Sequence, residues 1–195
     1  PDSGYGGSSK SIILAMQYLD YKNIVVSYFC RKNNPNIKNL KKKNIKIFFI
    51  EKLPRLRATK SFIKNIIVIY RFLNDYIKNF KHIKKLKSKL NEYDVVHINN
   101  DSVAANFHLF GNNKTKIITH VRSVLEKNWL SKIQVKIIKK ISNKIIFIGK
   151  QEYSAFTKKK NNNNQYFVLL NPVESNAAFK RKEKKTANII LFWVF

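Results

Sequence analysis

Short apolar runs alternate with longer stretches of helical periodicity along most of the chain. The apolar runs are rich in β-branched and aromatic residues and predict strands at residues 23–29, 45–50, 94–98, 116–119, 144–148, 165–170 and 188–195. The stretches between them predict helices at residues 60–90 (two helices or one bent helix), 102–110, 128–141 and 151–158. Because strands that alternate with helices form parallel sheets covered by helices, the pattern predicts an α/β fold with a doubly wound parallel sheet.

A glycine-rich segment precedes the first helical pattern. Three of the five glycines fall within the first seven residues, and the apolar positions of a helix follow at once. Such a segment exposes backbone N–H groups and the positive end of a helix dipole, so Gly6, Gly7 and Ser8 form a candidate anion-binding site. It matches neither G-x-G-x-x-G nor a Walker loop, and a flexible loop with a capping serine is the other interpretation. No strand precedes it, so we expect the first strand of the sheet to be missing.

Lysine dominates the charge of the chain. The formal net charge is +28, from 39 lysines and arginines, only six of them arginine, against 11 acidic residues. Because readers of nucleic acids favour arginine, and because lysine accompanies abundant asparagine and isoleucine, we interpret most of this charge as solvated surface. Two alternatives stay open. One is attraction to anionic membrane lipids, and the other is a lysine-rich nucleic-acid-binding module with clusters at residues 41–43 and 84–85.

The cysteine count and the length of the apolar runs exclude several classes. Cys30 is the single cysteine, which rules out an intrachain disulfide and a zinc site built on several cysteines. No apolar run approaches the roughly 20 residues that a membrane-spanning helix needs. These features predict a protein of a reducing, cytoplasmic compartment.

Polar residues stand where the predicted strands end. In a parallel sheet ligands gather at the carboxyl ends of the strands, which selects the ends of two internal strands besides the glycine-rich segment. At these ends His120 is a candidate catalytic residue, and Arg122 suits a phosphate or carboxylate. Asn100 and Asp101 are candidate substrate-binding residues. A structural histidine, a surface ion pair and turn-forming caps are the simpler interpretations. His97 lies inside a strand and is expected to be buried.

Taken in order, six segments resemble the N-terminal domain of the family-4 glycosyltransferases, the large retaining group with the GT-B architecture and Rossmann-like domains. The matching segments are Gly6-Gly7-Ser8-Ser9, Asp94-Val95-Val96-His97-Ile98-Asn99, Lys116-Ile117-Ile118-Thr119-His120, Lys144-Ile145-Ile146-Phe147-Ile148-Gly149, Glu152-Tyr153-Ser154 and Leu169-Leu170-Asn171-Pro172-Val173-Glu174. The resemblance implies an N-terminal, acceptor-side domain at residues 1–175. It implies a linker and the first strand of a truncated second domain at residues 176–195.

The resemblance also implies an activity. It is the transfer of a sugar from a nucleotide-sugar donor to a glycan or lipid-linked acceptor with retention at the anomeric carbon, in bacterial surface polysaccharide synthesis. The backbone of Gly6 and Gly7 would approach the donor diphosphate, and His120 would lie beside the donor sugar. No metal or cofactor is expected besides the nucleotide-sugar co-substrate. Because the second domain grips the nucleotide and supplies a carboxylate pair, a fragment without it is expected to be inactive alone.

A basic, amphipathic surface on such a domain would suit docking to an anionic membrane that carries lipid-linked acceptors. The helical stretch at residues 78–90 is the expected contact, because lysines surround a stripe of Phe80, Ile83, Leu86 and Leu90. We therefore expect a cytoplasmic protein with peripheral contact at the inner face of the plasma membrane. Nucleic acid is the less favoured partner.

Overall fold

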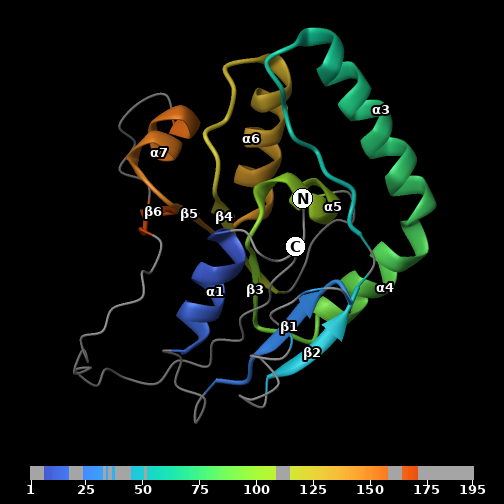
Figure 1. Cartoon of the computed structure of the whole chain (residues 1–195), viewed down its shortest axis with the longest axis vertical. Coiled ribbons are helices and arrows are strands. Elements are labelled where there is room, and N and C mark those ends of the chain that lie inside the picture. Colours follow the sequence, from blue (N-terminus) through green and yellow to red (C-terminus); the bar gives the residue numbers. More distant parts are fainter. Residues whose placement is uncertain are drawn as a thin grey trace.

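The structure is a computed structural model that describes residues 7–17, 24–32, 34, 37, 45–50, 52–108, 115–157 and 164–170. The chain folds as an α/β protein in which every described strand pair is parallel (Figure 1). This confirms the predicted α/β class and the parallel strands. The predicted linker and strand at residues 176–195 lie outside the described residues.

Four strands form the larger sheet, in the order β3-β4-β5-β6. Their bounds are Val95–Ile98 for β3, Lys116–Val121 for β4, Lys144–Phe147 for β5 and Tyr166–Val168 for β6. In the register of this sheet His97 lies opposite Ile118, and His120 lies opposite Ile146. Because side chains alternate between the two faces of a strand, His97 and His120 share one face of the sheet. β4 extends beyond the predicted strand, so that His120 belongs to the strand itself.

Two further strands, β1 (Ser27–Cys30) and β2 (Lys46–Phe49), pair in parallel and form a separate sheet. The described strands therefore form two sheets, where the sequence predicted one. The two sheets meet through side chains, because Phe29 of β1 shares a core cluster with Val96 and Ile98 of β3. Among the described residues, no ladder of backbone hydrogen bonds joins β1 or β2 to the larger sheet.

The helices confirm the predicted alternation. Their bounds are Gly7–Gln17 for α1, Phe62–Lys78 for α3, Phe80–Leu90 for α4, Ala105–His108 for α5, Trp129–Ile141 for α6 and Lys150–Thr157 for α7, with a 3-10 turn, η1, at Asp101–Val103. The region at residues 60–90 thus forms two helices, separated at Asn79, whose side-chain amide donates to the Asp75 carbonyl at 2.8 Å. No helix in the described ranges is long and apolar enough to span a bilayer.

Helices cover both faces of the smaller sheet. Ile12 and Met16 of α1 pack with Tyr28 and Cys30, whereas α4 packs against the neighbouring Phe29, whose side chain points to the opposite face. Burial raises the pKa of the Cys30 thiol to about 11. A third cluster joins α6 and α7 to the larger sheet through Ile138, Phe156, Val121, Ile145 and Phe147.

α3 occupies an outer edge of the molecule, beside α4 and away from the strands (Figure 1). Its inner side is held by one apolar cluster, in which Phe72 contacts Leu56, Ala105 and Leu130. Its N-terminus is capped by Ser61, whose hydroxyl accepts the Lys64 N–H at 3.4 Å. α3 is therefore anchored mainly on its inner side, with a further contact between the rings of Phe62 and Trp129 at 5.9 Å.

Candidate functional site

The carboxyl ends of β3 and β4 bring four polar side chains together, which we call the edge cluster: Asn99, Asp101, His120 and Arg122. Three of the four were candidates from the sequence, because parallel strands deliver their carboxyl ends to one edge of the sheet. Asn99, Asp101 and His120 are buried, and Arg122 is partly buried. A buried group of this polarity is unusual in a protein interior and needs hydrogen bonds to persist.

Arg122 is the centre of the edge cluster. Its Nε donates to Asn99 Oδ1 at 2.5 Å, and its Nη2 lies 3.4 Å from His120 Nδ1. Its backbone N–H donates to Asp101 Oδ1 at 3.4 Å. Burial lowers the pKa of Arg122 to about 10, against the opposing effect of Asp101, so the guanidinium remains charged at neutral pH. One fixed cation thus orients the other members of the cluster.

His120 is a neutral hydrogen-bond donor in this arrangement. A guanidinium can only donate, so His120 Nδ1 accepts from Arg122 and the ring proton resides on Nε2. Burial lowers the pKa of His120 to about 2, with added effects from the Arg122 and His97 charges. The side chain is 6% exposed, and its Nε2 has no hydrogen-bond partner among the described residues. A buried N–H without an acceptor is costly to maintain, which marks this atom for a functional interpretation.

His97 packs against His120 from the neighbouring strand. The two rings stack with centroids 5.6 Å apart and planes inclined by 18°. Burial, followed by the Arg122 charge, lowers the pKa of His97 to about 3, and its side chain is 7% exposed. His97 is buried as predicted. It restrains the ring of His120 and remains neutral with it.

Asp101 connects the edge cluster to α6. Its Oδ2 accepts from Gln134 Nε2 at 2.9 Å, while its Oδ1 accepts from the Arg122 backbone. Burial raises the pKa of Asp101, and the backbone hydrogen bonds and the Arg57 and Arg122 charges oppose this shift. Both carboxylate oxygens are therefore engaged with this chain's own donors, which suits a positioning role.

The other predicted residues have separate places. Asn100 is the N-cap of η1, where its Oδ1 accepts from the Ser102 N–H at 3.0 Å and from the Ser102 hydroxyl at 2.8 Å. Gly7 and Ser8 are the first residues of α1, which packs on the smaller sheet. Gly6 lies outside the described residues. The structure thus joins His120, Arg122 and Asp101, but it does not place Gly7 or Ser8 in the edge cluster.

Sequence reasoning missed three members of this neighbourhood: Asn99, Gln134 and Arg57. Gln134 left a signal, because it interrupts the buried stripe of α6, which otherwise contains Leu130 and Ile138. A polar residue inside an apolar stripe requires a buried partner. Arg57 left no such signal, since its proximity to Asp101 arises from an extended segment that bonds to η1 through the Leu56 N–H and the Ser102 carbonyl at 2.8 Å.

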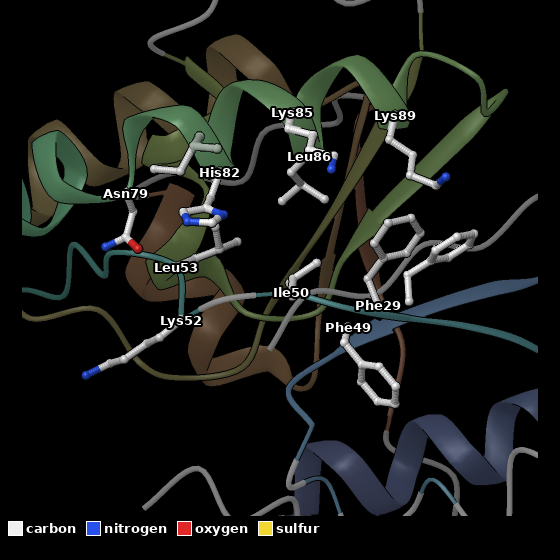
Figure 2. A pocket seen from close by; sticks show the side chains of 12 residues that line it. Phe29, Phe49, Ile50, Lys52, Leu53, Asn79, His82, Lys85, Leu86 and Lys89 are labelled. Atoms are coloured by element: carbon white, nitrogen blue, oxygen red, sulfur yellow. The ribbon is translucent and has the colours of Figure 1, made fainter.

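A separate pocket of about 370 Å³ lies between α4 and the end of β2 (Figure 2). Its interior is apolar, and Phe48 stacks on Phe29 with ring centroids 4.7 Å apart. Lys89 Nζ lies 4.3 Å from the centre of the Phe48 ring. Figure 2 shows His82 and Leu86 extending from α4 toward the segment after β2. The lining contains three lysines and one histidine and no acidic residue. This pocket therefore suits an anionic, partly apolar molecule.

Within the described ranges, no group of three or more His, Cys, Asp or Glu side chains is arranged to hold a metal ion. No protein-family model, curated protein or solved structure matches this chain. The chemistry of the edge cluster is therefore the main basis for a functional conclusion. A neutral buried N–H beside a fixed guanidinium can bind hydroxyl and phosphate oxygens.

Proposed function

We propose that this chain is the acceptor-side domain of a retaining glycosyltransferase. The proposed reaction transfers a sugar from a nucleotide-sugar donor to a glycan or lipid-linked acceptor. The observation that carries the proposal lies at the carboxyl edge of a parallel sheet, where the Nε2–H of His120 has no acceptor among the residues that the structure describes. The ordered motif resemblance and the α/β fold with parallel strands support it.

His120 acts in this proposal as a neutral donor and not as a general base. Its lowered pKa leaves Nε2 protonated and uncharged throughout the neutral range, so the ring cannot gain a proton during turnover at neutral pH. Nε2–H would donate to a hydroxyl of the donor sugar and strengthen that contact as charge develops in the transition state. Arg122 fixes the ring orientation through Nδ1. Asp101 holds the Arg122 backbone and α6 in register.

The donor diphosphate would lie against the backbone of Gly6 and Gly7, with Ser8 as a further donor at the start of α1. Arg122 supplies a positive charge at the carboxyl edge of the larger sheet, which would suit the developing negative charge on the leaving diphosphate. Asn100 would contribute through its backbone, since its side chain caps η1. The second domain of such an enzyme supplies the remaining nucleotide contacts.

The lysine-rimmed pocket under α4 is the proposed seat of an anionic acceptor group. Lys85 and Lys89 lie at its rim, and its aromatic floor suits the chain of a lipid phosphate (Figure 2). The described lining of the pocket contains no carboxylate. A phosphate-bearing acceptor would therefore meet no competitor for the lysines and no negative charge that repels it. The pocket thus makes a lipid-linked acceptor the preferred choice over a neutral glycan.

The test is sugar transfer by the protein that joins this domain to a nucleotide-binding second domain. His120→Ala is expected to lower kcat by about 10²–10³-fold, as removal of one donor to a transition-state charge does. His108→Gln changes a partly exposed histidine at the end of α5, outside both the edge cluster and the lining of the pocket under α4, and serves as the control for loss of an imidazole. Near-normal turnover of His120→Ala, with an unchanged melting temperature, would overturn the site assignment.

A further inference from the structure

The side of α3 that faces away from the protein is covered with large apolar side chains. This outer face of α3 comprises Phe62, Ile63, Ile66, Ile67, Tyr70, Leu73 and Ile77, and Phe80 at the start of α4 continues it. Each of these side chains is between 42% and 73% exposed. Spacings of three and four residues place most of them in one row along the helix.

Phe62, at the start of the row, contacts Trp129 of α6 with ring centroids 5.9 Å apart, but the main anchor of α3 lies elsewhere. Asn65 and Phe72 provide the buried contacts on the opposite side, so the helix is already anchored without its outer face. The exposed apolar area amounts to several hundred Å², which is larger than a monomeric soluble protein ordinarily exposes without an interaction partner. The outer face therefore calls for a partner, and α3 lies at the edge of the molecule, where a partner can reach it (Figure 1).

The charges around the outer face identify the partner. α3 and α4 carry eight basic residues: Lys64, Arg71, Lys78, Lys81, Lys84, Lys85, Lys87 and Lys89. Their one acidic residue is Asp75. A second copy on the same face would bring these cations together, whereas an anionic lipid surface would attract them and accept the apolar row at its headgroup boundary. We infer that α3 is a membrane-surface helix that inserts its outer face into an anionic lipid interface.

This inference moves the apolar contact from α4 to α3. The sequence favoured residues 78–90, but Ile83, Leu86 and Leu90 are buried against the core and cannot reach a membrane. Lys81 and Lys84 of α4 lie outside the lining of the pocket under α4 and remain for that surface. The two helices thus divide the work, with apolar insertion by α3 and electrostatic attraction by both.

The experiment is co-sedimentation of the 195-residue chain with vesicles of phosphatidylcholine, alone or with about a third of phosphatidylglycerol. The wild-type chain is expected to bind the anionic vesicles and to bind the neutral ones far less. Ile66→Glu with Ile77→Glu is expected to weaken binding to anionic vesicles at least tenfold. Val25→Glu with Val124→Glu adds the same charge at exposed apolar positions outside α3 and serves as the control for the added charge. This control is expected to weaken vesicle binding much less.

Lys81→Gln with Lys84→Gln tests the electrostatic part and is expected to lower binding about fivefold for each lysine near the surface. Equal losses in the α3 pair and its charge-matched control would overturn apolar insertion. Concentration-dependent dimers in light scattering that disappear in Ile66→Glu with Ile77→Glu, without vesicle binding by the wild type, would instead assign the face to a second copy and overturn the inference. Vesicle binding is measured without sugar transfer, so its outcome is independent of the proposed activity.

Discussion

Proteins usually bury apolar side chains and expose polar ones, and two regions of this molecule do the reverse. The edge cluster buries charged and polar groups at the ends of β3 and β4, while the outer face of α3 exposes seven large apolar side chains. Each departure costs stability that a merely structural protein would not need to give up. The two regions are therefore the places where we propose that this chain binds other molecules.

The side chains of the two regions differ in how many contacts they make with the rest of the protein. In the edge cluster Arg122 contacts each of the other three members. Its side chain contacts Asn99 and His120, and its backbone N–H donates to the Asp101 carboxylate. On the outer face of α3 each side chain of the row is at least 42% exposed, although Phe62 contacts Trp129, and the helix is held mainly from its other side. Preorganised polar groups suit a small ligand with defined atoms, whereas a bare apolar row suits a broad, adaptable surface.

The largest expected effect separates the two sides of α3. Phe72→Ala is expected to lower the free energy of unfolding by about 3–5 kcal/mol, because it opens a cavity beside Leu56 and Leu130. Tyr70→Ala on the outer face is the matched control and is expected to change it by less than about 0.5 kcal/mol. Urea denaturation measures both. Similar losses for the two variants would show that the outer face is covered in the folded chain.

A smaller loss is expected in the edge cluster. Arg122→Ala removes the donor to Asn99 and His120 and one of the two cations whose charge acts on the buried Asp101, at a cost of about 3 kcal/mol in unfolding free energy. Arg57→Ala removes an exposed arginine whose charge also acts on Asp101 and should cost well under 1 kcal/mol. Equal costs in urea denaturation would refute the central place given to Arg122.

The smallest expected effect is a dependence of stability on pH. Both histidine pKa values are lowered in the folded chain, to about 3 for His97 and about 2 for His120, so between pH 6.5 and these values the unfolded chain binds protons that the folded chain does not. Their contribution is complete above pH 6.5 and is lost as the pH falls, with a slope of about 1.4 kcal/mol per pH unit for each histidine.

His120→Gln is therefore expected to reduce the slope of unfolding free energy against pH by about 1.4 kcal/mol per pH unit between pH 6 and 5. The raised pKa of Asp101 acts in the opposite direction in acid and remains in both proteins, so it cancels in the difference. Denaturant melts at several pH values supply the measurement, with His82→Gln, an exposed site, as control. An unchanged slope would contradict a buried neutral imidazole at position 120.

Local pattern was enough for most elements of the fold. The apolar run and flanking turns placed β5 at its observed position. The helical periodicity at residues 60–90 predicted either two helices or one bent helix, and the structure has two. The pairing of strands was less accessible, because it depends on which segments meet in space. Phe29 reads as an ordinary strand residue, yet it joins two sheets through side-chain packing.

The topology of the sheet was enough to predict which residues of the site lie near one another. Parallel strands bring their ends together, which brought Asp101, His120 and Arg122 into one neighbourhood before any contact was known. The tautomer of His120 was not predictable, since it depends on a 3.4 Å contact with one nitrogen of Arg122. The exposed face of α3 was equally hidden, because α3 and α4 both show apolar stripes and periodicity does not say which stripe is covered.

Cys30 has a practical consequence for studying these surfaces. The thiol is fully enclosed between α1 and the smaller sheet, and burial raises its pKa to about 11, so the native chain carries almost no reactive thiolate at neutral pH. A cysteine introduced at Tyr70 would then react alone with a maleimide dye or spin label. Site-specific spectroscopy of α3 needs no cysteine-free background, and the smaller sheet keeps its own packing throughout.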